Sequence, residues 1–203
     1  MNAARIVILD TETTGLPKHP EASPVEVAAV ALDHDGFEVA AFSSLVRPRA
    51  LGEWALPALE LNGLTVAQVE AAPHHVAVAM AVHQWVAMLG DPPATSFNVA
   101  FDRLMLERMN LLFGAWDPCI MEAATSIMGQ AGKLVERRWG PGWLWPKLHV
   151  AAAHFGVTPP EPAHRALSDA RTAAGIWCAI EAMPGRAVME GAPSAVFSGE
   201  DAS

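Results

Sequence analysis

Apolar and polar positions in the first fifty residues follow patterns that predict three strands. Residues 6–9, "IVIL", form a continuous apolar run that is typical of a fully buried strand. Residues 24–48, "PVEVAAVALDHDGFEVAAFSSLVRP", contain two β-compatible runs separated by Asp35-Gly36, a dipeptide that favours a tight hairpin turn. The first apolar run ends in two acids, Asp10 and Glu12, which the packing of a buried strand does not require.

Helical spacing and capping residues predict most of the remaining elements. Thr65 and Gln68 have the spacing of a capping box, which begins a short helix. Residues 94–97 are expected to form a short strand, whereas residues 116–120 fit either the end of a strand or the start of a helix. A segment rich in Gly, Trp and basic residues is expected to form a long loop at 129–146. Further helices are expected at residues 56–62, 73–89, 100–113, 147–155 and 166–182.

This order of elements predicts an α/β sandwich built on a mixed sheet. The second strand must run antiparallel to its neighbours, because a hairpin cannot join parallel strands. The 203 residues fit one domain, which we place at residues 1–182, followed by a flexible C-terminal tail of small and acidic residues at 183–203. The chain contains no apolar run near the roughly 20 residues that span a bilayer. The N-terminus has no signal-peptide pattern, so we expect a cytoplasmic protein with no membrane partner.

The charge distribution bears on possible partners. The net charge of −9 argues at first against nucleic acid, because phosphate binding usually requires a basic surface. The charge is unevenly spread, however: residues 1–60 contain nine acidic and four basic residues, and residues 133–171 contain six basic and three acidic residues. A phosphodiester substrate bound through metal ions is compatible with this pattern.

Three clusters of polar residues are candidates for a functional site. In a strand, residues two apart point to the same side, so Asp10 and Glu12 can reach one ion. An Asp near a helix start is often only a cap, and a lone His is more often structural than catalytic, so each cluster alone is a weak signal. The three clusters are Asp10 with Glu12, Asn98 with Phe101 and Asp102, and His164 with Asp169.

In this order and with these spacings, the clusters resemble the DEDDh 3′-to-5′ exonucleases. That family includes the proofreading subunit of bacterial replicative polymerases, ribonuclease T and oligoribonuclease. The matching stretches are "DTETTGL" at 10–16, "NVAFD" at 98–102 and "HRALSDA" at 164–170, and the resemblance extends over about residues 5–180. It implies a ribonuclease H-like fold, with a mixed five-stranded sheet, one antiparallel strand, and helices on both faces.

The resemblance also implies the catalytic residues. Asp10, Glu12, Asp102 and Asp169 would bind two divalent ions, Mg²⁺ or Mn²⁺, with Asp10 bridging them, and His164 would be the general base. The chemistry agrees, because four carboxylates make a hard oxygen site and an imidazole with a pKa of about 6.5 can accept a proton near neutral pH. A sister subfamily uses a Tyr in place of the His, and this chain contains no Tyr.

Substrate contacts follow from the same resemblance. Thr13, Thr14 and Leu16 would border the terminal base and sugar, Asn98 would help to hold the strand, and Phe101 would offer an aromatic face. Stacking of this kind accepts any base, so little sequence specificity is expected. The segment 133–147 has two interpretations, either core packing by its Trp residues or a basic, aromatic flank for a single strand.

The leading hypothesis is a metal-dependent exonuclease that releases nucleoside 5′-monophosphates from the 3′ end of single-stranded DNA. The alternatives are an exoribonuclease that trims RNA ends or short oligoribonucleotides, and a non-catalytic module that binds nucleic acid or a polymerase. A polymerase therefore stays a possible partner, and the oligomeric state stays open. Glu26 is interpreted as a supporting residue near the site rather than as a metal ligand.

Overall fold

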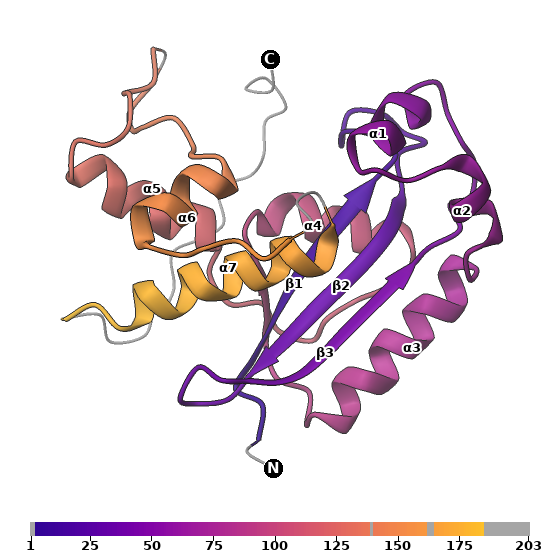
Figure 1. The fold of residues 1–203 in the computed structure, drawn as a ribbon, viewed down its shortest axis with the longest axis horizontal. Coiled ribbons are helices and arrows are strands. Elements are labelled where there is room, and N and C mark those ends of the chain that lie inside the picture. The colour runs from indigo at the N-terminus through magenta and orange to yellow at the C-terminus, as the bar shows by residue number, and fades with distance from the viewer. Residues whose placement is uncertain (1–2, 139, 162–164, 185–203) are drawn as a thin grey trace.

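A mixed sheet forms the centre of the fold in the computed structural model, which describes residues 3–138, 140–161 and 165–184. β2 runs antiparallel to both β1 and β3, whereas β1 and β4 are parallel, which confirms the mixed sheet with one antiparallel strand. Figure 1 shows β1, β2 and β3 side by side. The strand order is β3-β2-β1-β4, with β1 at Ile6–Thr13, β2 at Pro24–Leu32, β3 at Glu38–Leu45 and β4 at Ala94–Ser96.

The hairpin between β2 and β3 has the predicted turn. Gly36 adopts a φ of +82°, a conformation that L side chains rarely adopt. The carboxylate of Asp33 accepts the backbone N–H groups of Asp35 at 3.0 Å and Phe37 at 2.9 Å. Local side-chain chemistry therefore closes this turn.

The described part of the chain has a sheet of four strands, whereas five strands were expected. Beside β4, the place of a fifth strand is taken by one parallel bridge between Ala94 and Trp116. Asp117 N–H donates to the Ala94 carbonyl at 2.8 Å, but the next residue, Pro118, has no N–H with which to continue the ladder. Residues 116–120 are thus both the remnant of a strand and the approach to a helix that begins at Ile120.

Helices cover both faces of the sheet, as the resemblance implies (Figure 1). On β1, Ile6 and Ile8 are buried toward one set of helices, and Val7 and Leu9 are buried toward the other. The first set consists of α5 (Ile120–Gln130), α6 (Leu148–Phe155) and α7 (Ala166–Glu181). The second set consists of α3 (His75–Met88) and α4 (Val99–Arg108). A strand that is buried on both sides explains the unbroken apolar run of the sequence.

The helix α4 ends five residues before the predicted end at residue 113. Asn110 has a φ of +61°, and Leu111 N–H donates to the Leu106 carbonyl at 3.0 Å. This hydrogen bond closes a common helix C-terminal motif, in which Asn can take the left-handed position that Gly usually occupies. The apolar spacing continues beyond Asn110 because Leu111 is still buried, although it is no longer helical.

Two short helices lie at the end of the sheet where β1 finishes (Figure 1). They are α1 (Ala55–Leu61) and α2 (Val66–Ala71), and they match the short helices that were predicted. The capping box is present, because Gln68 N–H donates to Thr65 Oγ1 at 3.3 Å and Thr65 N–H donates to the Gln68 side chain at 2.8 Å.

The predicted loop at 129–146 begins two residues later, because α5 ends at Gln130, and it contains a short hairpin. Glu136 and Trp143 form an antiparallel bridge, and Trp145 packs against the core beneath the Arg137 guanidinium, 4.9 Å from the ring centre. The predicted tail at 183–203 lies outside the described residues from residue 185 onward. Within the described ranges, no helix has the length and apolar character needed to cross a membrane.

Candidate active site

Two acids lie side by side on one face of β1. The strand was predicted to stop at residue 9, but it continues to Thr13, so Asp10 and Glu12 belong to its last four residues. They point to the same face as Ile6 and Ile8, and on the neighbouring strand they face Ala28 and Glu26. The strand therefore holds both carboxylates on a rigid backbone, where the apolar packing of that face ends.

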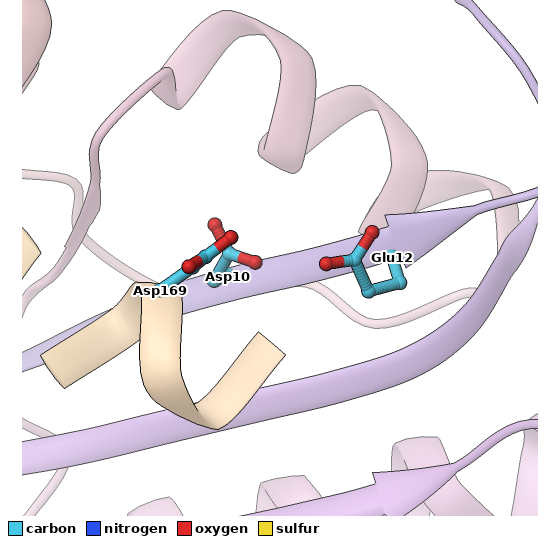
Figure 2. Close-up of side chains that lie close together, drawn as sticks. All are labelled: Asp10, Glu12 and Asp169. Atoms are coloured by element: carbon cyan, nitrogen blue, oxygen red, sulfur yellow. The ribbon is translucent and has the colours of Figure 1, made fainter. Parts of the chain in front are cut away.

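A third acid reaches them from α7. Asp169 lies in the first turn of this helix, and Figure 2 shows its carboxylate next to that of Asp10, with Glu12 farther along the strand. Carboxylate oxygens of the three residues lie within 4.8 Å of one another. Such a set of hard oxygen donors is suited to Mg²⁺ or Mn²⁺.

Asp102 approaches from α4 and lies outside this group of three. The residue is 3% exposed, and its carboxylate accepts a hydrogen bond from Thr11 Oγ1 at 2.7 Å. Thr11 points away from Asp10 and Glu12, since it lies between them on the strand. The strand thus connects the four predicted acids: Asp10 and Glu12 belong to it, Asp169 lies over one face, and Asp102 is held by a side chain of the other face.

Burial raises the pKa of several carboxyl groups in the site, and crowding of negative charge adds to the effect at Asp10 and Glu12. Burial raises the pKa of Asp10 well above its usual value, and the charges of Asp102, Glu12 and Asp169 raise it further. Burial and the charge of Asp169 raise the pKa of Glu12 to about 7. Burial raises the pKa of Asp102 to about 6, although the hydrogen bond from Thr11 opposes the change. Like charges at this spacing favour bound cations or protons.

An ion pair between a buried carboxylate and a partly exposed guanidinium fixes the start of α7. Glu26 is 2% exposed and accepts two hydrogen bonds from the Arg165 guanidinium, at 2.8 and 2.9 Å. The backbone N–H of Ala166 also donates to Glu26, at 3.3 Å. This pairing agrees with the interpretation of Glu26 as a supporting residue. His164, the predicted general base, directly precedes Arg165 but lies outside the described residues.

The carboxylates open into a cleft of about 580 Å³. Three of the predicted substrate contacts, Thr13, Leu16 and Phe101, line this cleft. Thr14 and Asn98 are not among its lining residues. The hydroxyl of Thr14 accepts the N–H of Ser23 at 3.0 Å, and the side chain of Asn98 caps α4 by accepting the N–H of Phe101 at 3.3 Å.

Several residues that line the cleft were not predicted from the sequence. Apart from Thr11 on β1, they come from the loop after β1 and from α1 with the residues on either side of it, two segments whose proximity has no local sequence signal. Trp54 offers the best signal, since it is an aromatic residue in an otherwise irregular link between a strand and a short helix. The additional lining residues are Thr11, Gly15, Lys18, His19, Trp54, Pro57, Ala58, Leu61 and Asn62.

A family model described as Exonuclease, the RNase T family, matches residues 7–177. The chain belongs to this exonuclease family. Its matched region contains all four acids and His164, and a family of metal-dependent nucleases accounts for the acidic group in the cleft.

Individual relatives agree with this assignment. The chain is 29% identical over 191 residues to the uncharacterized exonuclease CP81 of Escherichia phage 186, with 86% of this chain and 87% of that protein covered. It is also similar to the structure of E. coli exonuclease I in complex with a dA16 oligonucleotide, with a TM-score of 0.64, 16% identity and coverage of 87% of this chain and 40% of the other.

The chain is also similar to a 3′-exonuclease whose structure was solved for its 3′-end specific recognition of a histone mRNA stem-loop. The TM-score is 0.65 and the identity is 18%, with 87% of this chain and 63% of the other covered. The chain therefore spans less than two thirds of each of these two solved exonucleases. At this level of identity the structures show the shared ribonuclease H-like fold.

Proposed function

We propose that this protein is a DEDDh-type 3′-to-5′ exonuclease. It would hydrolyse the phosphodiester bond at the 3′ end of single-stranded DNA and release nucleoside 5′-monophosphates. The observation that supports this most directly is the convergence of Asp10, Glu12 and Asp169, with oxygens within 4.8 Å of one another in a cleft of the exonuclease domain.

The acidic residues fit a pair of divalent ions. All the donors are carboxylate oxygens, and burial together with the neighbouring carboxylates raises the pKa of Asp10 and of Glu12, so bound cations would offset charge at both residues. Asp10, Glu12, Asp102 and Asp169 would hold two ions, Mg²⁺ or Mn²⁺. When bound, such ions activate water and stabilise the charge on the leaving oxygen of a phosphodiester.

The surrounding residues hold these ligands in place. Thr11 orients the Asp102 carboxylate through its 2.7 Å hydrogen bond, and the cap of Asn98 fixes the first turn of α4. The Arg165–Glu26 pair anchors the start of α7, which carries Asp169. Positioning of this kind matters because small displacements of catalytic groups cost large factors in rate.

We assign the proton transfer to His164. An imidazole nitrogen would accept a proton from the attacking water, which an ordinary histidine can do near neutral pH. The position of His164 in the chain supports this role, because the next residue is tied to Glu26, which faces Glu12 across β1 and β2.

The proposal is tested with 5′-labelled oligonucleotides. Single-stranded DNA, duplex DNA and RNA are incubated with Mg²⁺, Mn²⁺ or EDTA, and the products are resolved at single-nucleotide steps. Stepwise shortening from the 3′ end of single-stranded DNA is expected with metal and no cleavage with EDTA. Preferential degradation of RNA would move the assignment to RNA trimming, and binding without degradation would indicate a non-catalytic module.

Variants connect the activity to the site. His164→Ala is expected to lower the rate by at least about 100-fold, the lower end of the range for general acid–base catalysis, and Asp10→Asn is expected to lower it at least as much. Asp35→Asn is the matched control, since this exposed acid lies in the β2–β3 turn at the far end of the strand. Unchanged cleavage by Asp10→Asn would contradict the proposed site.

A further inference from the structure

The outer face of α3 carries no charged side chain. The helix spans fourteen residues and contains no Asp, Glu, Lys or Arg, although 17% of the chain is charged. Its water-facing side includes Met80, which is 68% exposed, and Met88, which is 71% exposed. A surface helix normally turns charged and polar residues to solvent, whereas a helix that is apolar on all sides is usually covered by protein. The composition of α3 is therefore that of a helix whose outer face is covered.

The strand next to α3 ends the sheet. β3 lies at the outer edge of the order β3-β2-β1-β4, and Figure 1 shows α3 running alongside it. Phe42 on β3 contacts Trp85 on α3, with ring centroids 6.0 Å apart. Residues three and four apart are neighbours on a helix, so the exposed side chains beside Trp85 are Ala81 and Met88. These two residues continue the uncharged surface of α3 toward the edge of the sheet.

β3 presents backbone groups on the side away from β2. Val46 N–H donates to β2 at 2.8 Å, and alternate residues of an antiparallel strand bond to the same neighbour, so Ala41 and Ser43 point their N–H and C=O groups outward. Arg47 has the same outward direction, and its N–H donates to the Pro73 carbonyl at 2.8 Å. No strand within the described ranges pairs with this side of β3. The edge thus offers hydrogen-bond donors and acceptors between small, exposed side chains.

This edge lacks the usual protection against pairing. Natural edge strands carry Lys or Pro, bulge away from the sheet, or are covered by other elements. β3 reads "EVAAFSSL", with neither Lys nor Pro, and its one charge, on Glu38, is paired with Arg171 at 2.8 Å. The irregularity in its pairing with β2 lies at Ala31 and Leu32, beside Glu38, and leaves the rest of the strand regular. Such an edge is a template for another strand.

The lack of charge indicates which partner fits. Nucleic acid is bound largely through basic side chains, and this surface has none. Two copies of a chain with a net charge of −9 repel each other, so they associate best through a face without charge. A second copy brings an identical uncharged face, and a two-fold axis perpendicular to the sheet makes the two β3 strands antiparallel. A symmetric interface of this kind uses the same patch on both subunits.

We propose that the protein forms a symmetric dimer in which β3 pairs with β3 of a second copy and the two α3 helices pack side by side. The backbone groups of Ala41 and Ser43 then join the two four-stranded sheets into one. Ala77 and Ala81 are small, so the helices can approach closely. None of these residues lines the acidic cleft, and the inference is therefore independent of the proposed function.

The test measures the oligomeric state of the full chain by sedimentation velocity over a series of protein concentrations. The wild type is expected to be a dimer that dissociates on dilution. Ala81→Glu, near the middle of α3, places like charges opposite each other across the two-fold axis and is expected to raise the Kd of the dimer by at least about 10-fold. Ser43→Pro removes an outward N–H and is expected to weaken the dimer similarly. Circular dichroism establishes that both variants are folded.

A charge exchange identifies the surface. An equal mixture of Ala81→Glu and Ala81→Lys is expected to associate again, because opposite charges then meet across the interface. Ala153→Glu is the matched control, since Ala153 is an exposed alanine on α6, outside the proposed interface. This control is expected to dimerise like the wild type.

The outcomes are separate from those of the nuclease assay. A wild type that stays monomeric at every concentration would overturn the dimer and leave the edge of β3 to a different uncharged segment. A dimer that persists unchanged in folded Ala81→Glu and Ser43→Pro would show that the copies meet elsewhere, and would also overturn it. Both variants are expected to keep the wild-type rate of cleavage, because neither residue lines the cleft.

Discussion

Replacing Glu12 by Gln removes one negative charge from the acidic group on β1 while it keeps the size of the side chain. In the folded protein the pKa of Glu12 is raised from 4.5 to about 7, chiefly by burial and then by the charge of Asp169. In the absence of divalent ions, we expect the Gln variant to be more stable than the wild type near pH 8 and nearly equal to it near pH 4.

The magnitude follows from the difference between the two pKa values. As pH rises, the unfolded chain releases its proton first, so the folded state binds more protons and the free energy of unfolding falls between about pH 4.5 and pH 7. Ionisation of Glu12 lowers the free energy of unfolding of the wild type by about 3 kcal/mol at pH 8 and by less than about 1 kcal/mol at pH 5. For a chain of this length, 3 kcal/mol corresponds to a rise in Tm of about 6–12 °C in the variant.

The assay is thermal unfolding followed by circular dichroism with EDTA at pH 5 and pH 8, repeated with excess Mg²⁺ or Mn²⁺. Metal is expected to stabilise the wild type by mass action and to stabilise the variant less. Glu70→Gln, at an exposed position on α2, is the control for a surface charge. The reasoning is refuted if the stability gained by Glu12→Gln in EDTA is the same at both pH values.

Three further variants test interactions around the site. Arg165→Gln is expected to lower the free energy of unfolding, measured with denaturant, by about 2–3 kcal/mol. This is less than the loss for a fully buried pair, because Arg165 is 39% exposed. Adding Glu26→Gln should recover most of the loss, and no recovery would contradict the pairing. Thr11→Val is expected to lower the free energy of unfolding by about 1–2 kcal/mol at pH 8 and to raise the pKa of Asp102, which NMR titration measures. Thr11→Ser keeps the hydroxyl and should leave that pKa near 6. Gly129→Ala is expected to cost about 1–3 kcal/mol in thermal unfolding, because its new methyl group would overlap a tryptophan ring of the following hairpin, and an unchanged Tm would show that the ring can move.

Local patterns predicted the elements that carry the site. Side chains alternate between the two faces of a strand, so the spacing of Asp10 and Glu12 placed both on one face of β1. The Asp35-Gly36 turn predicted the hairpin that makes β2 antiparallel. These signals depend on a few neighbouring residues and on backbone geometry, so the sequence contains them in full.

The errors have equally specific causes. The end of α4 was missed because Asn110 adopts a left-handed conformation that the apolar spacing around it does not indicate. The strand-or-helix alternative covered only residues 116–120, so the helix α5, which begins at Ile120, was not predicted over most of its length. The fifth strand is reduced to one bridge because a proline follows it. At Asn110 and at Pro118, one backbone position overrode a longer pattern.

The sequence by itself determined which acids stand at the end of a buried strand and at the starts of two helices, since periodicity and capping are local. Only the tertiary structure decided how they meet. Thr11 binds Asp102 across 91 residues and Arg165 binds Glu26 across 139, and the stack of His19 on Trp54 joins two loops. Contacts between such distant positions leave no periodic trace in the chain, because they arise when packing of the two sides of the sheet brings α4, α7 and α1 to the same end of β1.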